Sequence, residues 1–132
     1  MPLGRRPATR QRIAPPAPNF SCDRRNVAGL AVVEVAGDLD LSTAPILQRA
    51  LGAAIDSGPA PVIVDMRHLE FMDCAGLNAI DSQPDHDRLH LVHPTGEVRR
   101  VLELTDYDRT LHIYDTLEEA TAAATQSSDV AH

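Results

Sequence analysis

The residues best suited to chemistry lie together in one short segment, Asp73–Gly76, which reads Asp-Cys-Ala-Gly. The segment follows an apolar stretch and stands where a helix is expected to begin. The first turn of a helix has free N–H groups and a positive potential, so it stabilises an anion such as a phosphate. The small side chains of Ala75 and Gly76 would also let another chain approach closely. We therefore expect a recognition site here.

Acidic residues elsewhere offer a weaker alternative. Asp65 and Glu70, together with Asp73, could serve acid–base catalysis. No nucleophile, metal motif or nucleotide-binding loop accompanies them in the sequence, and acids at strand ends and turns are usually solvated or act as caps. We therefore expect no enzyme activity and no cofactor.

Histidines and acids are also dense in the segment 85–93. A metal site would need several of these side chains to converge on one ion. If the segment forms a strand, His90 and His93 point to opposite faces and cannot bind one ion together. We therefore expect no metal site.

The composition limits the class of protein. The chain has 132 residues, enough for one domain, and 43% of them are hydrophobic, enough for a core. A net charge of −7 argues against nucleic acid as a partner. Two cysteines are too few for a disulfide framework, no apolar leader indicates export, and no window reaches the roughly 18 apolar residues of a membrane span. These features predict a cytoplasmic protein that does not enter a membrane.

Charge and proline content divide the chain into three parts. Residues 1–19 contain five of the ten prolines and predict a disordered basic arm. Residues 20–126 have the pattern of a folded domain, and residues 127–132 are expected to fray. The part up to Arg25 has six arginines and one aspartate, so it carries about +5, and the remainder carries about −12. A basic arm therefore precedes an acidic domain.

Hydrophobic periodicity predicts alternating strands and helices, an α/β fold with a mixed, mostly parallel sheet of about four to five strands flanked by helices. Gly37 is expected to end the second strand, and Ser42 or Thr43 to cap the first long helix. A turn is expected at Asn26–Gly29. The predicted strands are Phe20–Arg25, Leu30–Val35, Pro61–Met66, Arg88–Val92 and His112–Tyr114, and the predicted long helices are Ala44–Ile55, Pro94–Leu104 and Leu117–Thr125.

Four stretches of the sequence resemble a known family. They read VVEVAGDLDLSTAPILQRAL, VIVDMRHLEFMDCAGL, RLHLVHPTGEVRRVLELTDYDR and IYDTLEEA, and they span most of the chain between Phe20 and Ala124. In this order they resemble the STAS domain, of the type found in bacterial anti-sigma-factor antagonists. The resemblance implies a STAS-like fold and a protein-binding regulator of transcription that catalyses no reaction.

The resemblance also implies a partner and a site. Such domains dock onto an anti-sigma factor that is a Ser/Thr kinase, and so free a sigma factor. The kinase switches them off by phosphorylating a Ser or Thr at the start of the second helix. That position falls on Cys74, and the family's acidic residue near it falls on Asp40. The implied partner-binding residues are Asp40, Ser42, Thr43, Asp73, Cys74, Ala75, Gly76 and Leu77.

Cys74 has no hydroxyl to phosphorylate, and Ala75 offers no substitute. One hypothesis is an antagonist that always remains competent to bind. A second is a thiol sensor, because oxidation of a cysteine at a helix start adds bulk and polarity. A simpler interpretation is that Cys74 is a small residue tolerated at a vacated position. Ser42 and Thr43 carry alternative hydroxyls, although we expect them to cap the helix.

The second helix of the domain is expected to be short. Only ten residues separate Leu77 from Arg88, and Pro84 interrupts them, which leaves one or two helical turns. A shortened helix would expose apolar surface on one flank of the sheet. The alternative function is therefore a degenerate STAS sensor or scaffold that binds a small ligand or self-associates, for example as a homodimer.

Overall fold

The computed structural model describes residues 11–12, 19–83, 85–93, 98–100 and 112–130. Strands and helices alternate along this part of the chain, as the sequence predicts. The strands are β1 (Gln11–Arg12), β2 (Phe20–Val27), β3 (Leu30–Leu39), β4 (Val62–Met72), β5 (Leu89–Val92) and β6 (His112–Tyr114), and the helices are α1 (Ala44–Asp56), α2 (Cys74–Asp81), the 3₁₀ turn η2 (His86–Arg88) and α4 (Leu117–Val130).

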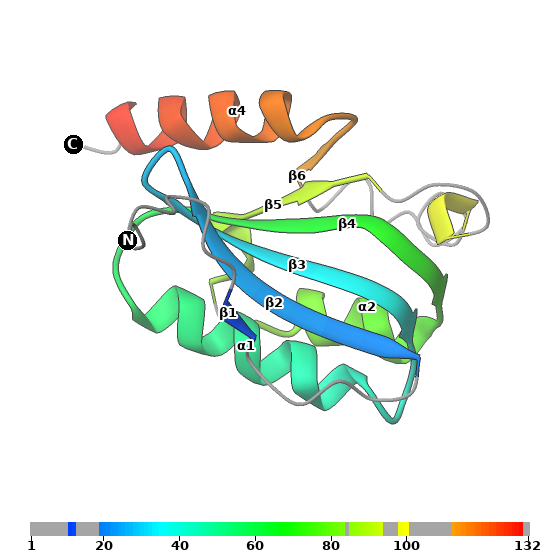
Figure 1. Cartoon of the computed structure of the whole chain (residues 1–132). Coiled ribbons are helices and arrows are strands. Elements are labelled where there is room, and N and C mark those ends of the chain that lie inside the picture. Colours follow the sequence, from blue (N-terminus) through cyan, green and yellow to red (C-terminus); the bar gives the residue numbers. More distant parts are fainter. Residues whose placement is uncertain (1–10, 13–18, 84, 94–97, 101–111, 131–132) are drawn as a thin grey trace, which may run out of the picture.

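The strands form one sheet in the order β1-β2-β3-β4-β5-β6. The pairs β1–β2 and β2–β3 are antiparallel, and β3 to β6 run parallel. Helices α1 and α2 cover one face, and α4 lies on the other (Figure 1). The predicted mixed, mostly parallel sheet flanked by helices is confirmed, with the two-residue β1 as an additional edge strand.

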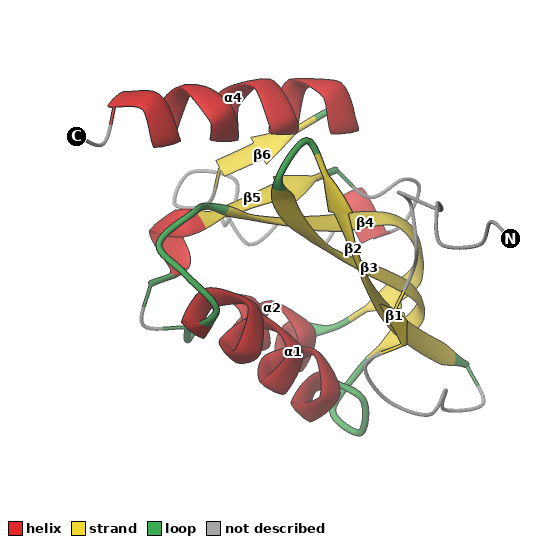
Figure 2. Ribbon diagram, turned by 60° about the vertical axis from the view of Figure 1, so that its left-hand side comes forward, coloured by secondary structure: helices red, strands yellow, loops and turns green. Residues whose placement is uncertain are grey.

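Two apolar clusters hold these layers together. The larger cluster fills the space between the sheet and the helices α1 and α2, where Leu47, Leu51 and Ile80 meet the inward side chains of the strands. The smaller cluster lies under α4, where Ala120 and Ala124 pack on Ile63, Val32 and Val92. Figure 2 shows the sheet between the two helical layers. Leucine, isoleucine, valine and alanine supply most of the core, because the chain has few aromatic residues.

The hairpin between β2 and β3 has the turn that the sequence predicts. Ala28 and Gly29 both have positive φ, 54° and 82°, which is the conformation of a two-residue type I′ turn. The Asn26 side-chain oxygen accepts a hydrogen bond from the Gly29 N–H at 3.1 Å. The turn sets the register in which Val27 pairs with Leu30.

Strand β2 runs two residues beyond its predicted end, to Val27, and two further strands, β3 and β4, extend much farther than predicted. Gly37 does not end β3, which continues to Leu39, because a φ of +92° lets the strand pass a point of close contact. A Cβ at Gly37 would lie 2.0 Å from the carbonyl oxygen of Asn19. Strand β4 likewise runs to Met72 and not to Met66, with irregular pairing to β3 in its second half. Both extensions carry the sheet up to the predicted recognition segment.

Helix α2 has eight residues, in agreement with the one or two turns expected. The apolar flank that its shortening was expected to expose is absent from the part of the sheet that the structure describes, where β5 and the first half of β4 are buried. The Gln83 side chain closes the end of the helix by donating hydrogen bonds to the carbonyl oxygens of Gln48 at 3.0 Å and Ala79 at 3.5 Å.

The remaining segments agree with the predictions only in part. Most of the predicted helix Pro94–Leu104 lies outside the described residues, although residues 98–100 are helical and Val98 is buried in the core. Helix α4 continues to Val130, beyond the residue where fraying was expected to begin. In the arm, Gln11 and Arg12 form a strand and not a disordered segment. No helix among the described residues is long and apolar enough to cross a membrane.

Candidate functional site

The predicted recognition residues lie on two loops that leave neighbouring strands at the same edge of the sheet. Leu39 at the end of β3 pairs in parallel with Met72 at the end of β4. The Asp73 N–H donates a hydrogen bond to the Leu39 carbonyl oxygen at 3.3 Å, which holds the two chains together where they leave the sheet. We call the surface formed by Asp40–Thr43 and Asp73–Leu77 the corner. The structure therefore brings both predicted segments together.

Asp40 organises the first loop of the corner. One of its carboxylate oxygens accepts hydrogen bonds from the Ser42 hydroxyl at 2.8 Å and from the N–H groups of Ser42 and Thr43 at 3.0 and 3.2 Å. The bond from the Ser42 hydroxyl, supported by the backbone donors, lowers the pKa of Asp40 below its ordinary value. Asp40 is therefore a structural acceptor for this loop, with its carboxylate kept ionised.

Thr43 begins α1, as predicted, but its hydroxyl does not bond to the helix N–H groups. It donates instead to the Asp38 carbonyl oxygen at 2.8 Å and accepts from the Asp40 N–H at 2.9 Å. The Thr43 side chain is buried, whereas Ser42 is exposed. Of the two alternative hydroxyls, only that of Ser42 faces solvent.

Asp73 caps the second helix of the corner. Its side chain accepts hydrogen bonds from the N–H groups of Ala75 at 3.0 Å and Gly76 at 3.2 Å, the usual arrangement of an aspartate N-cap. The cap occupies two of the free helix donors that the sequence suggested for an anion. An incoming group would therefore meet a negative carboxylate at this helix start.

The corner residues differ in how much they can contact a partner. Cys74 is exposed, Ala75 is half-buried, and Gly76 and Leu77 are buried. Gly76 lies against Leu39, where an added Cβ would be 2.8 Å from the Leu39 Cγ atom. Gly76 and Leu77 thus position the corner from below, and the contact surface consists of their exposed neighbours.

Two exposed apolar residues were missed by the sequence reasoning, one in the corner and one two residues before Asp73 in the chain. Leu41 is 77% exposed in the first loop, and Phe71 is 48% exposed next to the end of β4. They are the exposed large hydrophobic side chains of the described part of the chain. The sequence contains a signal for both residues. Leu41 is an apolar residue in an otherwise polar turn, and Phe71 is next to the buried Met72 in a strand, where successive side chains point to opposite faces. Both residues are candidates for contact with a protein partner.

The other polar groups have structural partners. Asp65 is fully buried and accepts hydrogen bonds from the Arg67 guanidinium at 2.8 and 2.9 Å and from its N–H. Burial alone would raise the pKa of Asp65, but the bonds from Arg67 outweigh it and lower the pKa. Asp65 is therefore the acid of an ion pair with Arg67.

The histidines also serve packing. His90 is buried and stacks on the rings of His112 and Tyr114, with centroid distances of 5.2 and 5.6 Å. Its Nδ1 atom lies 3.1 Å from the Tyr114 hydroxyl. Burial, together with the charge of His112, lowers the pKa of His90 to about 4. In the described part of the chain no three His, Cys, Asp or Glu side chains are grouped as metal ligands.

A mixed sheet with two helices on one face and paired loops at its carboxyl edge is the arrangement of a STAS domain. The family model of the STAS domain matches residues 22–120, and the chain belongs to this family. The family resemblance inferred from the sequence motifs is thereby confirmed.

Three proteins that are similar to this chain are anti-sigma factor antagonists by name. The anti-sigma-F factor antagonist RsfB of Mycobacterium tuberculosis is 27% identical over 96 residues, which cover 70% of this chain and 79% of the relative. The crystal structure of an anti-sigma factor antagonist from Mycobacterium paratuberculosis is similar, with a TM-score of 0.73 and 29% identity over 84% of this chain and 99% of that one. Unphosphorylated SpoIIAA, an anti-sigma factor antagonist, shares the fold at 20% identity, with a TM-score of 0.65 over 80% and 97% of the two chains.

Proposed function

We propose that this protein is an anti-sigma factor antagonist that binds an anti-sigma factor through the corner. The observation that carries the proposal is the pairing of Leu39 with Met72, which places the two predicted binding loops side by side on one edge of the sheet. Relatives of known name, RsfB among them, bear the same designation. Leu41 and Phe71 supply the apolar contacts that such an interface needs.

The corner is suited to binding and not to catalysis. Its two carboxylates, Asp40 and Asp73, both accept hydrogen bonds from the backbone of their own loops. These hydrogen bonds fix the conformation of the two segments, so both carboxylates have a structural role. Leu41, Ser42 and Cys74 are exposed on the two segments of the corner, so polar and apolar groups are both available to a protein partner.

The partner that we propose is a kinase-type anti-sigma factor. The corner lacks a hydroxyl at the position that such a kinase phosphorylates in the family. The family's acceptor position falls on Cys74, whose thiol a Ser/Thr kinase does not phosphorylate. Ser42 carries the exposed hydroxyl of the corner, and this hydroxyl donates a hydrogen bond to the Asp40 carboxylate. On this proposal the bound state persists in the presence of ATP, and the protein acts as an antagonist without a phosphorylation switch at the corner.

Binding is tested with the full chain as bait against the kinase-type anti-sigma factors encoded in the same genome. The expected result is capture of one of them, with the affinity unchanged after incubation with ATP. The test variant is Leu41→Ala, in the corner, which is expected to bind more weakly, and the control is Thr125→Ala, on the exposed side of α4, which is expected to bind like the unaltered chain. If no such factor binds and sizing shows concentration-dependent self-association, the scaffold alternative replaces this proposal.

The missing acceptor is tested with Cys74→Ser. Incubation of this variant with the captured kinase and ATP is expected to add one phosphate at position 74 and to weaken the complex. A phosphate on the helix start adds nearly two negative charges beside Asp40 and Asp73, which changes the surface that the partner contacts. Phosphate uptake by the unaltered chain at Ser42 would contradict the proposal that the switch is absent.

A further inference from the structure

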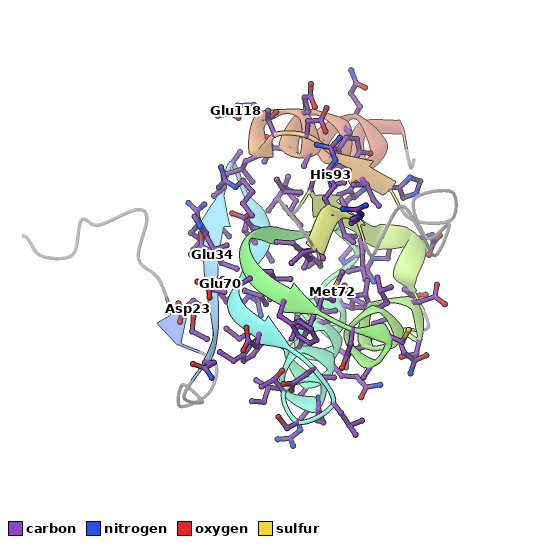
Figure 3. All side chains as sticks on the ribbon, turned by 90° about the vertical axis from the view of Figure 1, so that its right-hand side faces the viewer. Asp23, Glu34, Glu70, Met72, His93 and Glu118 are labelled. Carbon is purple, nitrogen blue, oxygen red and sulfur yellow. The ribbon has the colours of Figure 1, made fainter. Side chains whose placement is uncertain are left out.

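Three carboxylates form a row across the sheet on the face that α4 partly covers. Asp23 on β2 pairs with Glu34 on β3, and Glu34 pairs with Asp65 on β4. Residues paired in this way on neighbouring strands have side chains on the same face, and like charges there destabilise the sheet. We call Asp23, Glu34 and Asp65 the carboxylate row. Figure 3 shows Asp23 and Glu34 on the same side of the molecule.

The carboxylate row is removed from solvent, so it needs cations. The relative exposure of Asp23 is 6%, that of Glu34 is 9% and that of Asp65 is 0%. Arg67 binds Asp65, and the Arg25 Nε atom lies 3.4 Å from a Glu34 carboxylate oxygen. Buried carboxylates are costly unless they are paired. Arg25 of β2 thus pairs with Glu34 at the centre of the row, and Arg67 of β4 pairs with Asp65 at its β4 end.

Helix α4 does not extend over the whole row. It packs on β4, β5 and β6, and its small apolar cluster reaches β3 only at Leu30 and Val32. The surface over β2 and the middle of β3 lies to the side of α4 (Figures 1 and 2). Among the described helices, none packs on this part of the face, where three carboxylates lie with two arginines, Arg25 and Arg67.

Strand β1 lies at the β2 edge of this surface. It pairs antiparallel with β2, with Gln11 opposite Arg24 and Arg12 opposite Asp23. Arg12 therefore extends the row of paired positions, Asp23, Glu34 and Asp65, by one more strand. Residues 1–18 also contain Arg5, Arg6 and Arg10, and no acid. The positively charged arm therefore pairs with the domain at the β2 end of the carboxylate row.

We propose that the basic arm, residues 1–18, docks on the outer face of β2 and β3 through ion pairs with the carboxylate row, with Arg12 opposite Asp23 as its anchor. Guanidinium groups bind carboxylates in a bidentate manner and tolerate partial burial better than ammonium groups. The occupant is the chain's own arm, because β1 is already paired there. This surface lies apart from the corner, so its occupation does not depend on the proposed function.

The anchor is tested by charge reversal and amide hydrogen exchange on the full chain. Arg12→Glu is expected to speed exchange at the amides of residues 11–12 and 23–24 about three- to tenfold at low salt, whereas amides of β5 are unchanged. The exchanged pair Arg12→Glu with Asp23→Arg is expected to restore protection. The control is Arg49→Glu, which makes the same charge change on exposed α1. Equal exchange in Arg12→Glu and the unaltered chain, or an equal loss in Arg49→Glu, overturns the proposal.

A spin label distinguishes the chain's own arm from that of a second copy. The label is attached to Thr9→Cys in a Cys74→Ser background, in which the remaining Cys22 is buried. Broadening of the β2 and β3 amides is expected in the labelled chain at low salt, with loss of broadening at about 0.5 M salt. Broadening that arises only between a labelled and a separate isotope-enriched copy, or no broadening of these amides, overturns the proposal.

Discussion

Leu39 and Gly76 are in contact across the base of the corner, and the contact leaves no room for a side chain on Gly76. An added Cβ would lie 2.8 Å from the Leu39 Cγ atom, 2.9 Å from Cδ2 and 3.0 Å from the carbonyl oxygen. Leu39 ends β3 and Gly76 lies in the first turn of α2, so this one contact sets how closely the two loops approach.

Gly76→Ala is therefore expected to lower the free energy of unfolding by about 1–3 kcal/mol, since overpacking forces the buried Leu39 to move. The measurement is chemical denaturation of the full chain. Gly58→Ala is the control, because a Cβ at Gly58 meets nothing within 4 Å. Equal stability of the two variants would show that the contact is loose.

Removal of the Asp40 side chain should loosen the first loop. Asp40→Ala deletes the acceptor for three donors of Ser42 and Thr43, and we expect the loop to open more often, with faster exchange of its amides. The control is Asp56→Ala, which removes an exposed acid from the last turn of α1. Faster amide exchange at Ser42 and Thr43 in Asp40→Ala alone would confirm the local origin.

Truncation of the exposed apolar residues should separate binding from stability. Leu41→Ala and Phe71→Ala are each expected to weaken the complex with the anti-sigma factor by about 2 kcal/mol, because anchors at an interface contribute most of its energy. Neither should change the free energy of unfolding by more than about 0.5 kcal/mol, since both side chains face solvent. Titration calorimetry and denaturation of the same samples measure the two effects, and unaltered affinity in both variants would remove these residues from the interface.

His90 should make the fold sensitive to mild acid. Its folded pKa of about 4 lies below its ordinary value of 6.5, so the unfolded chain takes up the proton first as the pH falls. Stability is therefore unaffected above pH 6.5, declines below it, and the loss is complete near pH 4. Between pH 7.5 and 5 the loss from this group is about 2 kcal/mol. His90→Gln, compared at both pH values by denaturation, should lose correspondingly less, and an equal loss would place the sensitivity elsewhere.

The two cysteines should react very differently. Cys22 is buried, and its burial, with a contribution from Asp23, raises the pKa of its thiol to about 12. Cys74 is exposed. Iodoacetamide is expected to modify one thiol in the native chain and two in urea, and Cys74→Ser should abolish the native reaction. Native modification of Cys22, detected by mass spectrometry, would show that β2 opens readily.

Local patterns predicted the helices and the turn because each has its own signal. The apolar spacing of α1, the positive-φ turn at Ala28–Gly29 and the proline after α2 depend on neighbouring residues alone. The ends of β3 and β4 depend on contacts between distant residues. Gly37 reads as a strand end, yet its conformation is required by the approach of Asn19, which the order of residues does not reveal.

The site was predicted to a similar extent. The motif positions Asp40 and Cys74 lie in segments that follow the paired ends of β3 and β4, as expected, Asp40 in a loop and Cys74 at the start of α2. Their exposure could not be derived, because it depends on which side chains the sheet turns inward. Gly76 and Leu77 proved to be buried supports, whereas Leu41 and Phe71, which no motif marks, are the exposed groups.

The ion pair between the buried Asp65 and the partly exposed Arg67 restricts which substitutions can be accepted at these two positions. Loss of Arg67 alone would leave an ionised carboxylate in a dry site, and loss of Asp65 alone would free a guanidinium beside the sheet. Loss of Arg67 alone is therefore expected to cost more than replacement of both residues by a neutral pair of similar volume. In an alignment of descendant sequences, positions 65 and 67 should therefore covary, with the acid and the arginine present together or replaced together.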